Sequence, residues 1–256
     1  MENQYLKNIK VGMNVVILTN QNKYSTGIIE DIAARNPFSE KGIMVRLKNG
    51  DIGRVKNIIL KEPEQNEKNA LEIKKIIEKG ESLHTEFKTS VLWSVDFSPV
   101  QIKETKSLEV REYGQRASKI IIAKSIAAFL NSDGGDLILG IKENRQEEKF
   151  EIIGINNDMK KAKQEGIDGY KRMLIDEVFR SYFPSKIYNH LDSYISFSFI
   201  NIDYEIVCRI KVKKSDSKVF LKLNNKEVFM IRINSENRTL DGEKLVDYCI
   251  RKWGAR

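Results

Sequence analysis

Short runs rich in Val and Ile, separated by polar and glycine-containing segments, fill the first 60 residues of the chain. Runs of this length and composition predict β-strands. Asn49-Gly50 suits the positive φ angles of a type I′ turn, so the runs on either side of it are expected to pair as a hairpin. Four or five short strands in so few residues predict a small SH3-like barrel. The predicted strands span residues 15–19, 27–32, 42–47 and 52–55.

The pattern then changes to a linker and a helix. Residues 61–70 are polar, contain a proline and show no periodicity, which is typical of a linker. Apolar residues recur at near-helical spacing from Leu71 to Lys79, and Gly80 follows as a C-terminal cap. The predicted organisation is a small β-barrel domain at 1–62, a linker and helix at 63–79, and a larger domain at 80–256.

The larger domain mixes helical and strand patterns. The clearest helix ends before Gly134 and Gly135, and it carries Ile122, Ile126 and Leu130 on one face. Residues 93–115 have no clear period and are expected to form a long loop. Predicted helices cover 118–131, 158–182 and 242–253, and predicted strands cover 136–141, 150–153, 195–202, 205–212, 219–223 and 227–233.

Composition narrows the class of protein. No run approaches the roughly 20 apolar residues of a membrane span, and the N-terminus lacks the regions of a signal peptide. Cys208 and Cys249 fit neither a disulfide framework nor a zinc cluster, so a reducing cytoplasm is expected, with no membrane contact. The net charge of +8 favours polyanions, chiefly nucleic acid, as partners.

One acidic segment stands out, from Gly80 to Ser90. It carries Glu81 and Glu86 five positions apart, followed by Lys88. This spacing places the two carboxylates on opposite faces of a strand and out of line on a helix, so they converge only if the backbone turns between them. An irregular corner followed by a short strand is therefore predicted. Such a pair beside a cation suits a divalent metal or general acid–base chemistry, while the alternative is two solvated surface glutamates.

Two parts of the chain carry motifs that resemble those of known families. Val11-Gly-Met-Asn-Val-Val-Ile-Leu and Gly42-Ile-Met-Val-Arg-Leu-Lys-Asn-Gly resemble the small YwbE-type repeat protein, which implies a fold for residues 1–62 rather than a function. Further along come Glu81-Ser-Leu-His-Thr-Glu86-Phe-Lys, Ile126-Ala-Ala-Phe-Leu-Asn-Ser-Asp-Gly-Gly-Asp-Leu-Ile-Leu-Gly-Ile and Val228-Phe-Met-Ile-Arg232. In this order they resemble the Schlafen AlbA-type domain, over about residues 80–253. The expected fold is α+β, with an all-β SH3-like barrel followed by a mixed α/β domain.

The second resemblance implies a site for metal-assisted phosphodiester hydrolysis. Members of the Schlafen group that cleave RNA use three acidic residues and a divalent ion, here Mg²⁺ or Mn²⁺. Glu81 and Glu86 match the first two acids. The third acid of relatives lies in a Gly-Val-Asp-Asp segment, where this chain reads Gly-Ile-Lys142-Glu143. If the first Asp is the ligand, Lys142 replaces it; if the second Asp is the ligand, Glu143 can supply the carboxylate. Asp136 is a further candidate for the third acid. The residues expected to bind the metal are Glu81, Glu86 and Glu143, with Lys88 as a further catalytic residue that stabilises charge on the phosphate.

Basic residues predict the nucleic-acid contacts. Arg209, Lys211 and Lys213 alternate with apolar positions, which indicates a cationic outer strand face, and Arg232 matches an arginine in a Tyr-x-Arg-x-Gly pattern of relatives. Such residues clamp phosphates or form a solvated face. Few of the basic stretches interleave aromatics, so base stacking is not indicated, and His84 and His190 are interpreted as packing and surface residues. The predicted nucleic-acid-binding residues are Lys88, Lys142, Arg209, Lys211, Arg232 and Arg238.

The sequence therefore predicts a nucleic-acid-binding protein. One interpretation adds metal-dependent endoribonuclease activity on structured RNA such as tRNA or rRNA. The alternative is a non-catalytic DNA-binding regulator or a defence-associated adaptor with the same basic surface. Assembly into a homo-oligomer stays open at this point.

Overall fold

The computed structural model describes residues 2–34, 36–59, 63–144, 146–147, 149–162, 164 and 166–254. The chain divides into two compact units, Met1–Lys74 and Lys75–Arg256. Lys61 and Glu62, the start of the predicted linker, lie outside the described residues, but the rest of that segment belongs to helix α1 (Pro63–Lys79). Proline suits the first turn of a helix, and the Glu, Gln, Lys and Ala residues that follow are good helix formers, so the helix forms without an apolar stripe in its first half.

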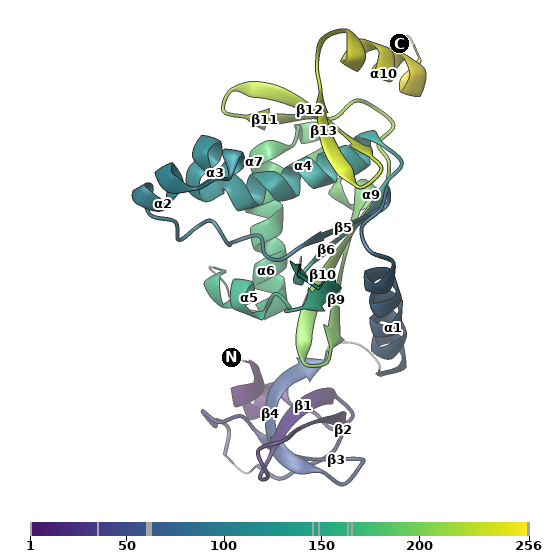
Figure 1. The fold of residues 1–256 in the computed structure, drawn as a ribbon. Helices are drawn as coiled ribbons and strands as arrows, with labels where there is room; N and C mark the ends of the chain where they lie inside the picture. Colours follow the sequence, from purple (N-terminus) through teal and green to yellow (C-terminus); the bar gives the residue numbers. More distant parts are fainter. Residues whose placement is uncertain are drawn as a thin grey trace. The chain divides into compact units, whose positions relative to one another are not determined.

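The first unit contains the predicted barrel. Its four antiparallel strands close in the order β1-β2-β3-β4 (Figure 1). The side chains that fill it come from alternate strand positions, as in Val15 and Ile17 of the first strand and Val55 of the last, all fully buried. The predicted hairpin forms, but of Asn49 and Gly50 only Gly50 has a positive φ (+90°), so the turn is not of the expected type I′. The strands are β1 (Asn14–Thr19), β2 (Tyr24–Ile32), β3 (Met44–Leu47) and β4 (Ile52–Ile59), preceded by the 3-10 turns η1 (Glu2–Gln4) and η2 (Leu6–Asn8).

The second unit is built on a four-stranded sheet of order β5-β6-β10-β9, in which β5 and β6 are parallel and the other pairs antiparallel. The predicted strand at 136–141 is two strands, because Gly140 adopts φ of +96° and turns the chain into a separate hairpin. The strands are β5 (Thr85–Lys88), β6 (Gly135–Leu139), β9 (Ile195–Ile202) and β10 (Glu205–Val212), and the hairpin is β7 (Ile141–Asn144) with β8 (Lys149–Ile152).

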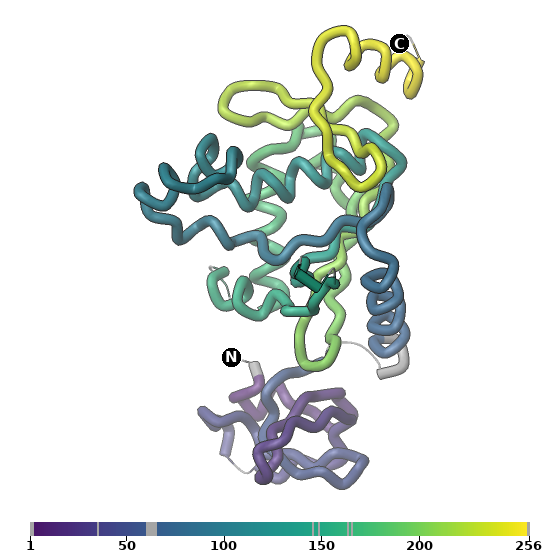
Figure 2. The backbone as a smooth tube through the Cα atoms, in the orientation of Figure 1, coloured from purple at the N-terminus to yellow at the C-terminus, as the bar shows by residue number. Residues whose placement is uncertain are grey.

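Helix α4 (Ala117–Asn131) lies between this sheet and a smaller three-stranded one (Figures 1 and 2). It is apolar on nearly all sides, as a helix covered by two layers must be. Its last residue joins the layers: the Asn131 amide donates to the carbonyls of Val219 (2.8 Å) and Met230 (2.9 Å) and accepts from the Val219 N–H (2.9 Å). The smaller sheet comprises β11 (Phe220–Leu223), β12 (Lys226–Ile233) and β13 (Glu236–Leu240), followed by α10 (Gly242–Trp253).

The expected long loop at 93–115 is largely helical. Ser98 and Gln101 form a reciprocal capping box at the start of one short helix, and Ser107 caps the next, so local side-chain bonds order this segment without an apolar period. These helices are α2 (Pro99–Glu104) and α3 (Leu108–Tyr113), followed by the turn η3 (Gly114–Arg116).

The predicted helix at 158–182 is interrupted. It forms α5 and then a continuous run of α6, a π-helical turn and α7, which packs against the four-stranded sheet through Phe179 and Phe197. These elements are α5 (Asn156–Lys161), α6 (Gly166–Leu174), η4 (Ile175–Phe179), α7 (Arg180–Tyr182), α8 (Ser185–Tyr188) and α9 (Leu191–Tyr194). Across the described part of the chain, every helix is too short or too polar to cross a membrane.

Candidate functional site

The acidic segment forms the predicted corner. Gly80 ends α1 with φ of +75°, and Ser82 and Thr85 then bond each other through their backbones (3.0 and 3.3 Å) in a tight turn before β5. The turn between the two glutamates is thus confirmed. Glu81 folds back and accepts a hydrogen bond from the N–H of Phe87 (2.9 Å), which brings it to the residue next to Glu86.

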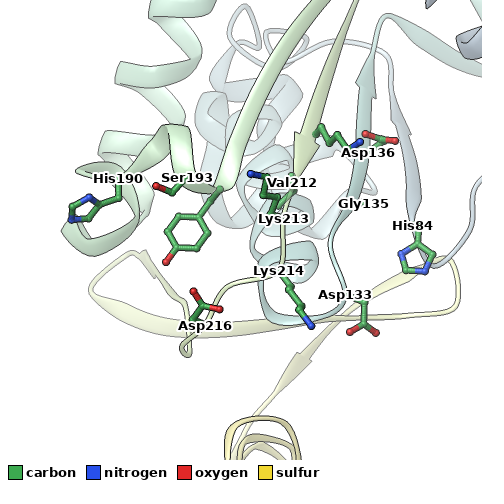
Figure 3. Close-up of a pocket in the computed structure, with 12 residues that line it drawn as sticks. His84, Asp133, Gly135, Asp136, His190, Ser193, Val212, Lys213, Lys214 and Asp216 are labelled. Carbon is green, nitrogen blue, oxygen red and sulfur yellow. The ribbon is translucent and has the colours of Figure 1, made fainter.

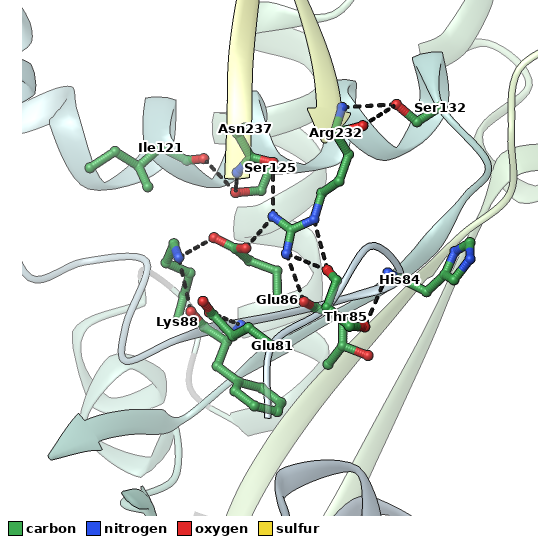
Figure 4. Close-up of polar contacts among 12 residues, drawn as sticks. Glu81, His84, Thr85, Glu86, Lys88, Ile121, Ser125, Ser132, Arg232 and Asn237 are labelled. Carbon is green, nitrogen blue, oxygen red and sulfur yellow. Dashed lines mark hydrogen bonds and ion pairs between the residues drawn. The ribbon is translucent and has the colours of Figure 1, made fainter. Parts of the chain in front are cut away.

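Arg232 of β12 reaches this corner from the other sheet (Figure 4). Its side chain is fully buried, and its guanidinium lies 5.1 Å from the ring centre of Phe129. Nε and one terminal nitrogen donate to the carbonyl of Ser82 (3.1 and 2.7 Å), and the same terminal nitrogen donates to that of Thr85 (2.7 Å). The other terminal nitrogen donates to Asn237 (3.0 Å) and pairs with Glu86. Every nitrogen of Arg232 is therefore bonded to a protein acceptor.

The Glu86 carboxylate is shared between two cations. One oxygen pairs with Arg232 and the other with Lys88, and the Glu86 residue is only 4% exposed. Glu81 is partly buried, and desolvation, with the nearby negative charge of Glu86 as the second cause, raises its pKa above the usual range. The two carboxylates are thus close enough to interact, but one of them is already neutralised.

This donor set does not suit the divalent ion that the resemblance implies. A metal at Glu86 would face Arg232 and Lys88, whose positive charges repel it. Glu143, the expected third ligand, is an exposed residue of the separate β7–β8 hairpin. Among the described residues no three His, Cys, Asp or Glu side chains are placed to hold an ion together. We therefore derive no chemical step through a metal.

The other predicted phosphate-binding residues separate into two kinds. Arg209 donates to both carboxylate oxygens of Asp136 (2.9 and 2.6 Å). Arg238 donates through two nitrogens to a single oxygen of Glu236 (3.0 and 2.8 Å). Lys142 is exposed on β7, and Lys211 is exposed on β10. Of the six predicted residues, only these two lysines present a charge at the surface without an ion-pair partner among the described residues.

Lys211 borders a broad hollow of about 930 Å³ at one end of the four-stranded sheet (Figure 3). The hollow lies where β6 begins, β10 ends and β9 begins. Figure 3 shows His84 and Asp133 on one side and His190 and Ser193 on the other. The Nδ1 of His84 lies 3.2 Å from the Gly134 carbonyl and donates to it, because a carbonyl only accepts. The lining residues are His84, Asp133, Gly135, Asp136, His190, Ser193, Tyr194, Lys211, Val212, Lys213, Lys214 and Asp216.

Charge in this hollow is positive on balance. Two of its three carboxylates are engaged: Asp133 pairs with Lys252 (3.1 Å), and Asp136 pairs with Arg209. The three lysines at its rim are exposed, and among the described residues none of them has an ion-pair partner. Three lysines and three aspartates line the hollow, and Arg209 and Lys252, which lie outside the lining, pair with two of these aspartates.

Gly134 and Gly135 shape this end of the sheet by close packing. Gly134 has φ of +78°, and a β-carbon there would lie 2.6 Å from the Val212 carbonyl oxygen. At Gly135 a β-carbon would lie 2.5 Å from the ring of Phe129. The glycines thus allow α4 and β6 to approach their neighbours.

Sequence reasoning missed part of this hollow. Lys213 continues the alternation of Arg209 and Lys211, so the strand pattern already indicated its outward direction, but Lys214 follows the strand and carries no periodic signal. The lysines border a common hollow because β6 and α9 lie opposite them, and the sequence does not show where these two elements are placed.

Two family models match the chain. The model of the Schlafen AlbA_2 family matches residues 81–241, more than half of the chain. A second model, described as an uncharacterized conserved protein family (DUF2196), matches residues 2–58 and coincides with the barrel. The similarity of this barrel to the YwbE-type protein stays a prediction. No curated protein matches the chain.

Solved structures show only distant likeness. A Corynebacterium diphtheriae protein is 13% identical with a TM-score of 0.41, covering 75% of this chain, which spans only 34% of that protein. The N-terminal domain of a DNA helicase RecG-related protein from Nitrosomonas europaea is 13% identical with a TM-score of 0.31, covering 61% of this chain and 96% of that domain. Similarity at this level carries no argument about function.

Proposed function

Because this chain belongs to the Schlafen AlbA_2 family, we propose that it binds nucleic acid and that the lysine-lined hollow of the second unit contacts the phosphate backbone. The observation that carries the proposal is the exposure of Lys211, Lys213 and Lys214, without ion-pair partners among the described residues, at one rim. Cations of this kind release counterions when they meet phosphates, which is the main source of affinity in nucleic-acid binding.

The form of the hollow supports backbone contact rather than base reading. It is open, and its donors are lysine ammonium groups, which act as mobile point charges without the fixed geometry of arginine. The imidazoles of His84 and His190 add hydrogen-bonding groups on opposite sides. Such a surface binds phosphates of RNA and DNA alike, so the proposed activity is sequence-tolerant binding.

The proposal does not include metal-dependent cleavage at the acidic corner. Glu86 is paired with both Arg232 and Lys88, and a carboxylate neutralised in this way is a poor ligand for Mg²⁺ or Mn²⁺. Binding without cleavage is the form of function predicted for a regulator or an adaptor.

The test is binding of labelled single-stranded RNA, single-stranded DNA and duplex DNA by fluorescence anisotropy over a range of salt concentrations. The variant Lys213→Gln/Lys214→Gln removes two charges from the hollow. The control Lys222→Gln/Lys226→Gln removes two charges from the exposed β11–β12 hairpin. We expect the hollow variant to weaken binding and to lower the slope of log affinity against log salt by about 1.5, since each phosphate contact contributes roughly 0.7–0.9.

The control variant should retain the wild-type affinity and slope. Equal losses in both variants would mean that only the net charge of the protein matters, and the hollow would then not be the site. A strong preference for duplex DNA, without cleavage of that DNA, would favour the interpretation as a non-catalytic DNA-binding regulator. Turnover of RNA by the wild-type protein would overturn the restriction to binding.

A further inference from the structure

The outer surface of the barrel carries two exposed aromatic rings in contact. Tyr5 and Phe38 are joined by a backbone bridge, their ring centres lie 5.0 Å apart, and they are 42% and 43% exposed. The two rings are inclined to one another by 51°, so each leaves part of its face open, and an exposed aromatic face is suited to hold a flat partner. The rings come from positions 33 residues apart, so the sequence does not show them as a cluster.

Cations surround this pair. The ammonium of Lys7 lies 5.6 Å from the ring centre of Tyr5. Arg54 of β4 donates to the hydroxyl of Ser39 (3.1 Å), the residue that follows Phe38, and to the Gly42 carbonyl (3.1 Å).

Lys56 extends the same surface. Its ammonium donates to the carbonyl of Lys41 (3.3 Å), so the loop after Phe38 is bordered by cations along its length. The acceptors of Arg54 and Lys56 are neutral, so these contacts fix the side chains without cancelling their charge. Within the described part of the barrel, Lys7, Lys41, Arg54 and Lys56 have no ion-pair partner, and Glu40 is the one acidic side chain in the loop.

We infer that this aromatic–basic face (Tyr5, Lys7, Phe38, Lys41, Arg54 and Lys56) binds single-stranded nucleic acid. Bases stack on the rings of Tyr5 and Phe38, and the phosphates on either side meet the cations. Stacking needs unpaired bases with an exposed π-face, which a duplex does not offer at its surface, so the face selects single strands. Base stacking, which the linear sequence does not indicate, becomes available because the fold brings aromatic and basic residues together.

This inference shares with the proposed function the premise that the chain binds nucleic acid, but it concerns a separate surface in the other unit. The two surfaces differ in chemistry. The hollow offers lysines together with two imidazoles and the half-buried ring of Tyr194, whereas the barrel offers two exposed apolar rings in contact with each other. A pair of strands that have the same phosphates but differ in the presence of bases therefore distinguishes binding at the barrel face from binding at the hollow.

The experiment uses the full chain and two labelled single strands of about 12 nucleotides, a length within the usual site size for such proteins. One is oligothymidine and the other is the abasic strand of the same length, which has the phosphates and lacks the bases. We expect wild-type protein to bind oligothymidine at least about tenfold more tightly, because even one stacked base contributes on the order of 1–3 kcal/mol. The variant Tyr5→Leu/Phe38→Leu should keep the apolar bulk and lose this difference.

Two further variants complete the test. Tyr5→Trp/Phe38→Trp should retain the preference for bases, and Lys7→Gln/Lys56→Gln should weaken both strands and lower the salt slope. Equal affinity of wild-type protein for the two strands, or a base preference that survives in the leucine variant, would overturn the inference. Lys213→Gln/Lys214→Gln should leave the ratio of the two affinities unchanged, so failure of the hollow and failure of the barrel face are separate results.

Discussion

Arg232 and Glu86 form an ion pair between two buried side chains that lie 146 positions apart in the sequence. The pair joins β12 of the smaller sheet to β5 of the larger one, with the rest of the guanidinium holding the turn before β5. A carboxylate in this position has a structural role, because it supplies the charge that allows an arginine to be buried.

The ion pair predicts strong coupling between the two residues. Glu86→Gln and Arg232→Gln each remove one charge of the buried pair, and each should lower the unfolding free energy of the second unit by about 3–5 kcal/mol. The double variant should lose less than the sum of the single losses. Urea denaturation followed by tryptophan fluorescence measures this unit alone, since Trp93 and Trp253 are the only two tryptophans in the chain.

Lys88→Gln is the matched control for this cycle. Lys88 also pairs with Glu86, but its side chain is 28% exposed, so its loss should lower the unfolding free energy by about 1 kcal/mol or less. Losses below about 1 kcal/mol in the Glu86 and Arg232 variants, with no coupling, would show that the buried pair does not hold the two sheets together.

Glu81 predicts a pH dependence of opposite sign to that of most carboxylates. Its pKa is raised in the folded state, chiefly by desolvation, so the folded protein binds more protons than the unfolded chain in the window above about pH 4.5. The contribution of Glu81 to the unfolding free energy is fully present below that pH and is lost as the pH rises through the pKa of Glu81 in the folded protein. Glu81→Gln should therefore stabilise the second unit at neutral pH and have little effect in acid. Equal effects at both pH values would contradict the assignment.

The acidic corner also predicts indifference to divalent ions. Because Arg232 and Lys88 neutralise Glu86, Mg²⁺ or Mn²⁺ should leave the unfolding free energy of the second unit unchanged, whereas a bound ion would raise it by mass action. Tryptophan-monitored unfolding with and without Mn²⁺ tests this. Stabilisation by Mn²⁺ that disappears in Glu86→Gln would restore the three-carboxylate interpretation.

Gly134 predicts a steric cost at the entry to β6. Alanine there would adopt an unfavourable positive φ, and its β-carbon would lie 2.6 Å from the Val212 carbonyl oxygen. Gly166 has a similar φ of +87° with open space around it, so Gly166→Ala measures the backbone cost alone, about 1–2 kcal/mol. Gly134→Ala should destabilise the second unit by more than Gly166→Ala. Equal losses would mean that the surrounding backbone relaxes without cost.

Strands and helices with a strong local pattern could be predicted from the sequence. The expected bounds of β9, β10 and α10 agree with the structure. The predicted strands at 219–223 and 227–233 are also present, joined by a turn in which Asn224 and Asn225 have positive φ angles. Elements without a hydrophobic period were missed. Strand β13 reads Glu-Asn-Arg-Thr-Leu and is fixed by its pairing with β12, and the helices α2 and α3 depend on serine caps.

The candidate sites could be predicted only where neighbours in sequence are neighbours in space. The turn between Glu81 and Glu86 follows from local spacing, and the outward direction of Lys211 follows from strand alternation. That Arg232 is buried against Glu86, and that the ring of Tyr5 contacts that of Phe38, depends on which strands pair and which layers pack. No local pattern contains this information.

The distance along the chain between Glu86 and Arg232 has a consequence for biosynthesis. A nascent chain that ends before β12 already contains β5 and α4, with Lys88 beside Glu86, but lacks Arg232, the buried cation of the pair. Until Arg232 emerges, burying this carboxylate between the layers is unfavourable, so we expect β5 to dock late. We therefore expect translation of the second unit to be nearly complete before its N-terminal strand is protected from solvent.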